Sequence, residues 1–108
     1  MTEKFDVKAI FASNLLRLRI NARLSQRELA EKSGFATNFI YDLENQKKCC
    51  STRTIGRFAE ALNVEPMQFF LSQDQWDNIE KQHCIAILNE LRNNIDNVIE
   101  NYQKNYFK

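Results

Sequence analysis

Residues 25–45, with the sequence SQRELAEKSGFATNFIYDLEN, predict two short helices that are joined by a tight turn. Ser25 and Glu28 have the S-x-x-E spacing of a capping box, in which each side chain accepts a hydrogen bond from the other residue's backbone N–H. Gly34 is expected to end the first helix, because glycine readily adopts the left-handed conformation found at helix C-termini. The second helix is expected from about 37 to 45, where apolar residues recur at helical spacing. A turn of about three or four residues that contains Gly is typical of such a helix pair.

Helical patterns continue on both sides of this pair. We expect a helix over about 7–22 before it and a polar loop over 46–50 after it. A fourth helix follows, capped by Ser51 or Thr52, and Pro66 begins a fifth short one. The residues expected in the core include Phe11, Leu29, Phe58 and Phe70. Two glycines and one proline are too few for the turns of a β-rich fold, so the sequence predicts an all-α protein.

Residues 72–108 differ in pattern from residues 1–71, and we expect the two parts to be separate domains. The second part contains no Gly or Pro and predicts one continuous helix. A helix of about 34 residues would be roughly 50 Å long. One face of it carries apolar residues at alternating spacings of three and four. They are Leu88, Leu91, Ile95, Val98 and Tyr102. The neighbouring Ile85, Ile87 and Ile99 make this apolar face wider.

This apolar face predicts an interface, because an isolated helix would expose it to water. A second copy of the chain is the expected occupant, since homodimers are the commonest oligomers. The packing stays open between a parallel coiled coil and a helical-hairpin or four-helix arrangement, because Trp76 and Ile79 fall outside the heptad register. The expected dimer contacts come from Ile85, Leu88, Leu91, Ile95, Val98, Ile99 and Tyr102.

The overall composition says little about the partner of this chain. Its 108 residues are 44% hydrophobic and 27% charged, as in an ordinary globular protein. The net charge is only +1, although residues 1–71 contain eleven basic and eight acidic side chains. This modest bias is weak evidence for nucleic-acid binding. No apolar run approaches the roughly 18 residues of a membrane span, and no basic-then-apolar leader is present, so we expect a cytoplasmic protein.

The sequence contains no pattern that predicts a catalytic or metal site. The single histidine, His83, lies in the tail, and no nucleophile, base and orienting acid can be assembled. Cys49, Cys50 and Cys84 lack zinc-site spacing, and adjacent cysteines rarely form a disulfide. We therefore expect no enzyme activity, no cofactor, no metal and no small-molecule ligand. Redox control through Cys49 and Cys50 stays an open alternative.

Three stretches of the chain resemble the Cro/CI-type (XRE) helix-turn-helix family of DNA-binding regulators. They are residues 24–34, 39–45 and 54–64, and the resemblance spans a little over half of the chain. It implies an all-α fold, namely a lambda-repressor-like helix-turn-helix bundle of five helices that is followed by a long C-terminal dimerisation helix. The domain of residues 1–71 would bind double-stranded DNA, and the helix in residues 72–108 would join two subunits.

The resemblance also implies roles for individual residues. The helix at 37–45 would lie in the major groove as the recognition helix. Base contacts are then expected from Ala36, Thr37, Asn38, Tyr41 and Asp42. Contacts with the DNA backbone are expected from Gln26, Asn45, Lys47, Lys48, Thr52 and Arg53. Arg19 and Glu44 match an ion pair that joins the first helix to the recognition helix in related repressors, and their expected role is structural.

The chain departs from the family pattern around the recognition helix. Gln46 stands where the family usually has Gly, and a non-Gly residue at positive φ costs about 1 kcal/mol. Asn45 is therefore the alternative residue for the left-handed position. Ala36 stands where a capping Ser or Thr is common, which predicts a loosely held helix start. Cys50 replaces the usual Pro ahead of the fourth helix.

The expected function is sequence-specific regulation of transcription, as a repressor. A homodimer would bind a palindromic operator whose half-sites lie about one DNA turn, roughly 34–36 Å, apart. An antitoxin is the alternative from another class, in which the tail binds a partner toxin and the chain regulates its own promoter. A restriction-modification controller is a narrower version of the first function.

Overall fold

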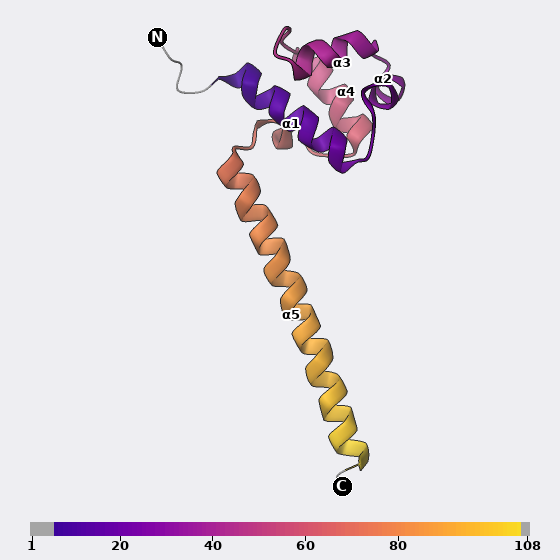
Figure 1. The fold of residues 1–108 in the computed structure, drawn as a ribbon, viewed down its shortest axis with the longest axis vertical. Helices are drawn as coiled ribbons and strands as arrows, with labels where there is room; N and C mark the ends of the chain where they lie inside the picture. Colours follow the sequence, from indigo (N-terminus) through magenta and orange to yellow (C-terminus); the bar gives the residue numbers. More distant parts are fainter. Residues whose placement is uncertain (1–5, 107–108) are drawn as a thin grey trace. The chain divides into compact units, whose positions relative to one another are not determined.

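The computed structural model describes residues 6–106, and every regular element within them is a helix. The elements are α1 (Val7–Asn21), α2 (Gln26–Ser33), α3 (Thr37–Glu44), α4 (Thr52–Leu62), the 3₁₀ helix η1 (Pro66–Phe70) and α5 (Gln73–Tyr106) (Figure 1). The all-α prediction is confirmed. The chain separates into two compact units, Met1–Ser72 and Gln73–Lys108, which are described in turn.

In the first unit, both ends of α2 form as the sequence predicts: a capping box begins the helix, and a glycine turn toward α3 ends it. Ser25 Oγ accepts the N–H of Glu28 at 3.0 Å, and Glu28 Oε1 accepts the N–H of Ser25 at 3.1 Å. Gly34 follows α2 in the left-handed conformation, with φ +79°. A Cβ at this position would run into the guanidinium of Arg57, which lies 4.2 Å from the ring centre of Phe35. Glycine therefore suits this turn through its backbone angle, and a side chain there would also displace the flexible end of Arg57.

The core of the first unit lies where its helices meet. α1 packs on α3 and η1, α2 packs on α3 and α4, and η1 packs on α4. The side chains at its centre are Leu15, Leu29, Ile40, Leu43, Phe58 and Phe69, all fully buried. Burial of one such side chain stabilises the fold by about 1.5–3 kcal/mol.

The end of this unit differs from the prediction. The fifth short helix is a 3₁₀ helix, and Phe70 is 41% exposed, whereas its neighbour Phe69 is fully buried. Phe69 packs against Phe11, with 5.4 Å between ring centres. Asn14, which the sequence analysis did not single out, donates its Nδ2 to the carbonyls of Phe69 at 2.7 Å and Leu71 at 3.0 Å. These bonds hold the main chain at Phe69 and Leu71, beside the point where the Phe69 side chain enters the core.

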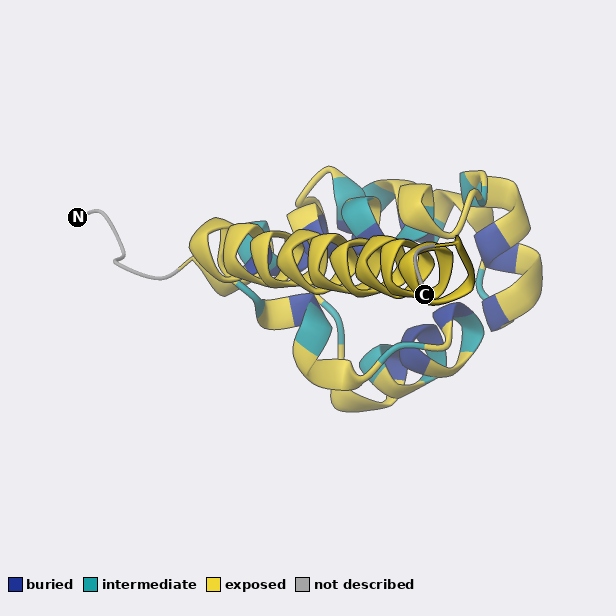
Figure 2. Ribbon diagram, turned by 90° about the horizontal axis from the view of Figure 1, so that it is seen from below, coloured by how far each residue is buried: buried dark blue, intermediate teal, exposed yellow. Residues whose placement is uncertain are grey.

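The second unit is the single helix α5. It has 34 residues, and residues 77–106 are all exposed, as the yellow ribbon in Figure 2 shows. Trp76 is its one buried side chain among the described residues. No helix in residues 6–106 combines the length and the apolar character that a membrane span needs.

Candidate nucleic-acid interface

Helix α3 has one face in the core and the other in solvent. Ile40 and Leu43 are buried on the inner face. The residues that we expect to contact bases all lie outside it: Ala36, Thr37, Asn38 and Tyr41 are exposed and Asp42 is half-buried. α3 therefore presents a continuous polar and aromatic surface, because its two core residues are three positions apart and occupy one side.

The N-terminus of α3 is held by the backbone alone. Ala36 occupies the N-cap position in an extended conformation, and no side chain caps the helix there. The N–H of Phe39 donates to the Ala36 carbonyl at 3.1 Å. Thr37 and Asn38 are thus exposed in a first turn that has no side-chain cap.

The loop after α3 turns back onto the helix. Gln46 adopts the left-handed conformation, with φ +61°, whereas Asn45 has φ −97°, so the alternative that gave this position to Asn45 is wrong. The physical reason is that the Asn45 side chain has another role: its Nδ2 donates to the Tyr41 carbonyl at 2.8 Å. The Tyr41 carbonyl thus accepts both this bond and the backbone N–H of Asn45 at 3.0 Å, and the next residue takes the left-handed angle.

Two lysines of this loop, both expected to contact the DNA backbone, lie against the outer side of α3. Lys47 places its Nζ 5.1 Å from the ring centre of Tyr41. Lys48 places its Nζ 3.4 Å from Asp42 Oδ2 and 5.8 Å from the ring centre of Phe39. Each lysine therefore contacts one of the residues expected to read bases, which the sequence did not indicate because these contacts depend on the path of the loop.

A buried carboxylate connects α3 to two other helices. Glu44 has a side chain that is only 4% exposed and accepts Arg19 Nε at 2.7 Å and Arg19 Nη2 at 3.0 Å. The third bond comes from Gln26 Nε2 at 3.0 Å. Arg19 also donates Nη1 to the Leu24 carbonyl, just before α2. The end of α3 is thus fixed to α1 and to the start of α2.

Gln26 contributes more than the expected contact with DNA. It is the first residue of α2, is half-buried, and supports Glu44 through one of its two amide N–H groups. Its second N–H is a further donor. The resemblance implies only the backbone contact for Gln26; its bond with Glu44 has no local sequence signal, because the two residues are 18 positions apart.

The remaining expected backbone contacts lie at the start of α4. Ser51, and not Thr52, is the cap: its Oγ accepts the N–H of Thr54 at 3.2 Å. Thr52 and Arg53 are exposed in the first turn of α4. Exposed donors at a helix N-terminus favour an anion such as phosphate.

The neighbouring cysteines differ in exposure. Cys49 is exposed and Cys50 is half-buried, and both are free thiols. Burial, assisted by the adjacent Cys49, raises the pKa of the Cys50 thiol to about 11. Cys50 therefore stays a neutral thiol near pH 7, which opposes the reactivity that a redox sensor needs. Within residues 6–106, no three His, Cys, Asp or Glu side chains form a group suited to a metal ion.

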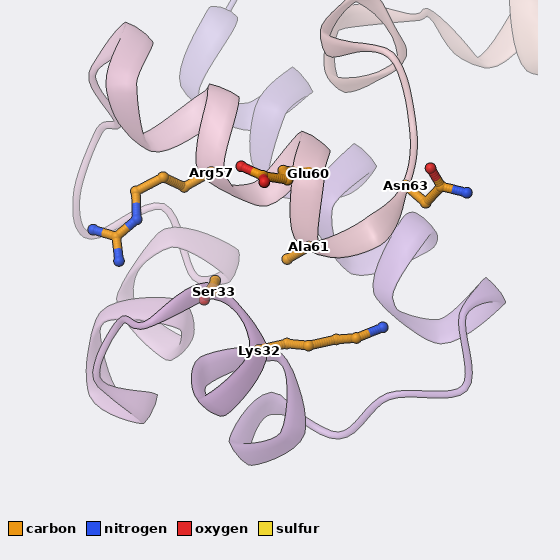
Figure 3. A pocket seen from close by; sticks show the side chains of 6 residues that line it. All are labelled: Lys32, Ser33, Arg57, Glu60, Ala61 and Asn63. Carbon is orange, nitrogen blue, oxygen red and sulfur yellow. The ribbon is translucent and has the colours of Figure 1, made fainter.

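A polar hollow of about 490 Å³ lies beside α2 and α4. None of the residues expected to contact DNA lines it. It is lined by Lys32, Ser33, Arg57, Glu60, Ala61 and Asn63 (Figure 3). Lys32 and Arg57 extend in opposite directions in this view, so their charges do not converge on one point. The hollow therefore lacks the concentrated positive charge that a phosphate-binding site needs.

Comparison with known proteins identifies relatives of the first unit. The profile of the helix-turn-helix family (HTH_3) matches residues 15–69. An uncharacterized HTH-type transcriptional regulator of Sinorhizobium fredii is 29% identical over 70 residues, which are 65% of this chain and 91% of the relative.

Two solved structures are also similar to this chain. A hypothetical transcription factor from Neisseria has a TM-score of 0.66 and 25% identity, over 73% of this chain and 91% of the other. The restriction-modification controller protein C.AhdI from Aeromonas hydrophila has a TM-score of 0.57 and 32% identity, over 58% of this chain and 96% of the other. The matches to all three relatives cover most of the other protein.

Proposed function

Since this chain belongs to the helix-turn-helix family of DNA-binding transcriptional regulators, we propose that it is a repressor that binds a palindromic operator as a homodimer. The observation that carries this proposal is the two-sided character of α3. Ile40 and Leu43 anchor it in the core, and its other side is open to solvent. A helix held in this way fits the major groove, where all base pairs present different hydrogen-bonding edges.

Base recognition is assigned to the outer residues of α3. Asn38 is exposed near the start of the helix, the end that reaches base edges in this family of folds. Its amide can pair with N6 and N7 of adenine. Thr37 can contact a thymine methyl group, and Asp42 can accept a hydrogen bond from a cytosine amino group. Ala36 and Tyr41 complete the surface that faces the bases.

Phosphate binding is assigned to residues on both sides of α3. Lys47 and Lys48 follow it in the chain, and Thr52 and Arg53 lie at the start of α4. Gln26 contributes its second amide N–H, and Asn45 lies at the turn after α3. Contacts of this kind position the protein on the duplex and make its affinity depend on salt.

Dimerisation is assigned to α5, and the division of the chain into two compact units supports separate DNA-binding and oligomerisation domains. The seven residues expected at the interface are 47–67% exposed. A shallow depression of about 240 Å³ on this helix is lined by Leu91, Asn94, Ile95, Val98 and Ile99. The first four have the i, i+3, i+4, i+7 spacing of a hole that receives a side chain from a facing helix. Such packing occurs in coiled coils and in four-helix bundles.

A restriction-modification controller is the second candidate function. The 32% identity with C.AhdI, over nearly the whole of that protein, favours it. It would use the same DNA-binding surface. A methylase and a nuclease encoded beside this chain are the expected sign of this role, and their absence would exclude it.

Selection of bound duplexes from random DNA tests the proposal. We expect an enriched palindrome whose half-sites lie about one helical turn apart. An enriched single half-site would contradict the dimer, and no enrichment at all would contradict sequence-specific binding.

A further inference from the structure

Asp42 and Lys48 neutralise each other in the free chain. Their Oδ2 and Nζ atoms are 3.4 Å apart, and the side chains are 24% and 56% exposed. The proposed function gives each of them a different partner on DNA, a base for Asp42 and a phosphate for Lys48. The two groups are therefore paired in the free chain, and contact with DNA would exchange this pairing for the base and the phosphate.

The backbone of the loop holds this pair together. The N–H groups of Lys47 and Lys48 both point to the carbonyl of Asp42, with N–O distances of 2.8 and 3.4 Å. The left-handed conformation of Gln46 turns the main chain back toward α3, so that these two N–H groups reach the Asp42 carbonyl. The ring of Phe39, on the same helix, lies 5.8 Å from Lys48 Nζ. The ammonium is thus directed to Asp42 by the fold of the loop as well as by charge.

We propose that Asp42 determines specificity by holding Lys48 until the amino group of a cytosine or an adenine replaces the ammonium at its carboxylate, and that Lys48 contacts a phosphate only then. This inference rests on the proposed function. An ionised carboxylate only accepts hydrogen bonds. The major-groove edges of cytosine and adenine each offer an amino N–H donor, whereas those of guanine and thymine offer only acceptors. At guanine or thymine, the carboxylate therefore keeps its lysine.

The exchange links base recognition to the salt dependence of binding. Each phosphate neutralised by a lysine adds about 0.9 to the slope of log K against log salt. A Lys48 that remains on Asp42 releases no counterion from DNA. We expect the slope for the selected operator to exceed that for a scrambled duplex by about one unit per bound chain. Between 50 and 200 mM salt, this difference corresponds to roughly 3.5-fold in affinity per chain.

Three variants of the full chain test this exchange on both duplexes over this salt range. Asp42→Asn keeps the side-chain shape but releases Lys48, so the slope for scrambled DNA should rise to that for the operator. Lys48→Gln should remove the difference by lowering the operator slope. Glu31→Gln is the matched control, because Glu31 Oε1 lies 3.4 Å from Arg27 Nε on α2. This control removes the same charge and should keep the difference between the two duplexes.

The outcomes separate this inference from the function on which it rests. Wild-type protein that shows equal slopes on operator and scrambled DNA would overturn the exchange, and so would Asp42→Asn protein that keeps the wild-type difference. Wild-type protein that prefers no sequence would overturn the proposed function itself. Circular dichroism and thermal unfolding of each variant establish that it is folded before binding is compared.

Discussion

The guanidinium of Arg19 holds the carboxylate of Glu44 through two bonds, Nε to Oε2 at 2.7 Å and Nη2 to Oε1 at 3.0 Å. Both side chains are largely buried, with 13% and 4% of their surfaces exposed. This pair connects the first helix to the last residue of α3. The direction of α3 relative to α1 is therefore tied to this buried pair.

Arg19→Met should destabilise the fold strongly, because it leaves the Glu44 carboxylate buried without its counter-ion. Breaking such a pair costs about 3–5 kcal/mol. The free energy of unfolding in urea, at fixed protein concentration, measures the effect. Arg27→Met is the control, since Arg27 and Glu31 are exposed on α2 and such pairs contribute about 0–1 kcal/mol. Similar losses in the two variants would contradict the role of the buried pair.

Gly34→Ala and Gly56→Ala should change stability in opposite directions. Gly34 has φ +79° and faces Arg57, so a methyl group there brings backbone strain and displaces the guanidinium. We expect a loss of about 1–2 kcal/mol. Gly56 lies within α4 with open space around it, and alanine there should stabilise the helix by about 0.5–1 kcal/mol. The free energies of unfolding of the two variants, compared with wild type, check both signs.

The capping box predicts a pH dependence of stability at Glu28. Hydrogen bonds from the backbone and side chain of Ser25 lower the pKa of Glu28 below its usual value of 4.5. The contribution of ionised Glu28 to the free energy of unfolding is therefore fully present above pH 4.5. It is lost as the pH falls through the lower pKa that Glu28 has in the folded state. Glu28→Gln should be less stable than wild type at pH 7, and the difference should shrink at acidic pH. A difference that stays constant from pH 7 to pH 3 would contradict this assignment.

Ile95→Asp should prevent dimerisation, because it places a charge in the centre of the apolar face of α5. Sedimentation of wild-type protein is expected to give the mass of two chains, and that of the variant the mass of one. Operator affinity should fall with it, because two linked binding units raise the effective concentration of each. Asn93→Asp, two residues away on the same exposed helix but outside the apolar stripe, is the control and should remain dimeric. A dimeric Ile95→Asp protein would place the interface elsewhere.

Asn38→Ala should relax the base preference at one operator position and weaken operator binding by about 1–3 kcal/mol. Binding to scrambled DNA should change little, because that affinity comes mainly from phosphate contacts. Fluorescence anisotropy with both duplexes at one salt concentration gives the comparison. Equal losses on the two duplexes would assign Asn38 to the backbone and not to a base.

Local signals in the sequence were sufficient for the four α-helices of the first unit. Ser25 with Glu28, and then Gly34, determine the ends of α2 within the chain itself, so the structure forms both features as predicted. The length of α5 was predictable for a similar reason, since no Gly or Pro interrupts residues 73–106. These features depend on neighbours along the chain and not on packing.

Features that depend on distant contacts could not be predicted from the sequence. Phe69 and Phe70 are adjacent and chemically identical, and nothing local in the sequence indicates that Phe69 is buried and Phe70 is 41% exposed. The pairing of Lys48 with Asp42 depends on the left-handed Gln46, for which the sequence offered Asn45 as an alternative. The candidate site residues were predicted from the resemblance, whereas the contacts among them required the structure.

The central claim is that the outer side of α3 distinguishes one DNA sequence from another. The most direct measurement is the affinity of the wild-type chain for its selected operator and for a scrambled duplex of equal length, at about 150 mM salt. The account predicts that the operator binds at least about 10³-fold more tightly. Equal affinities for the two duplexes would contradict it.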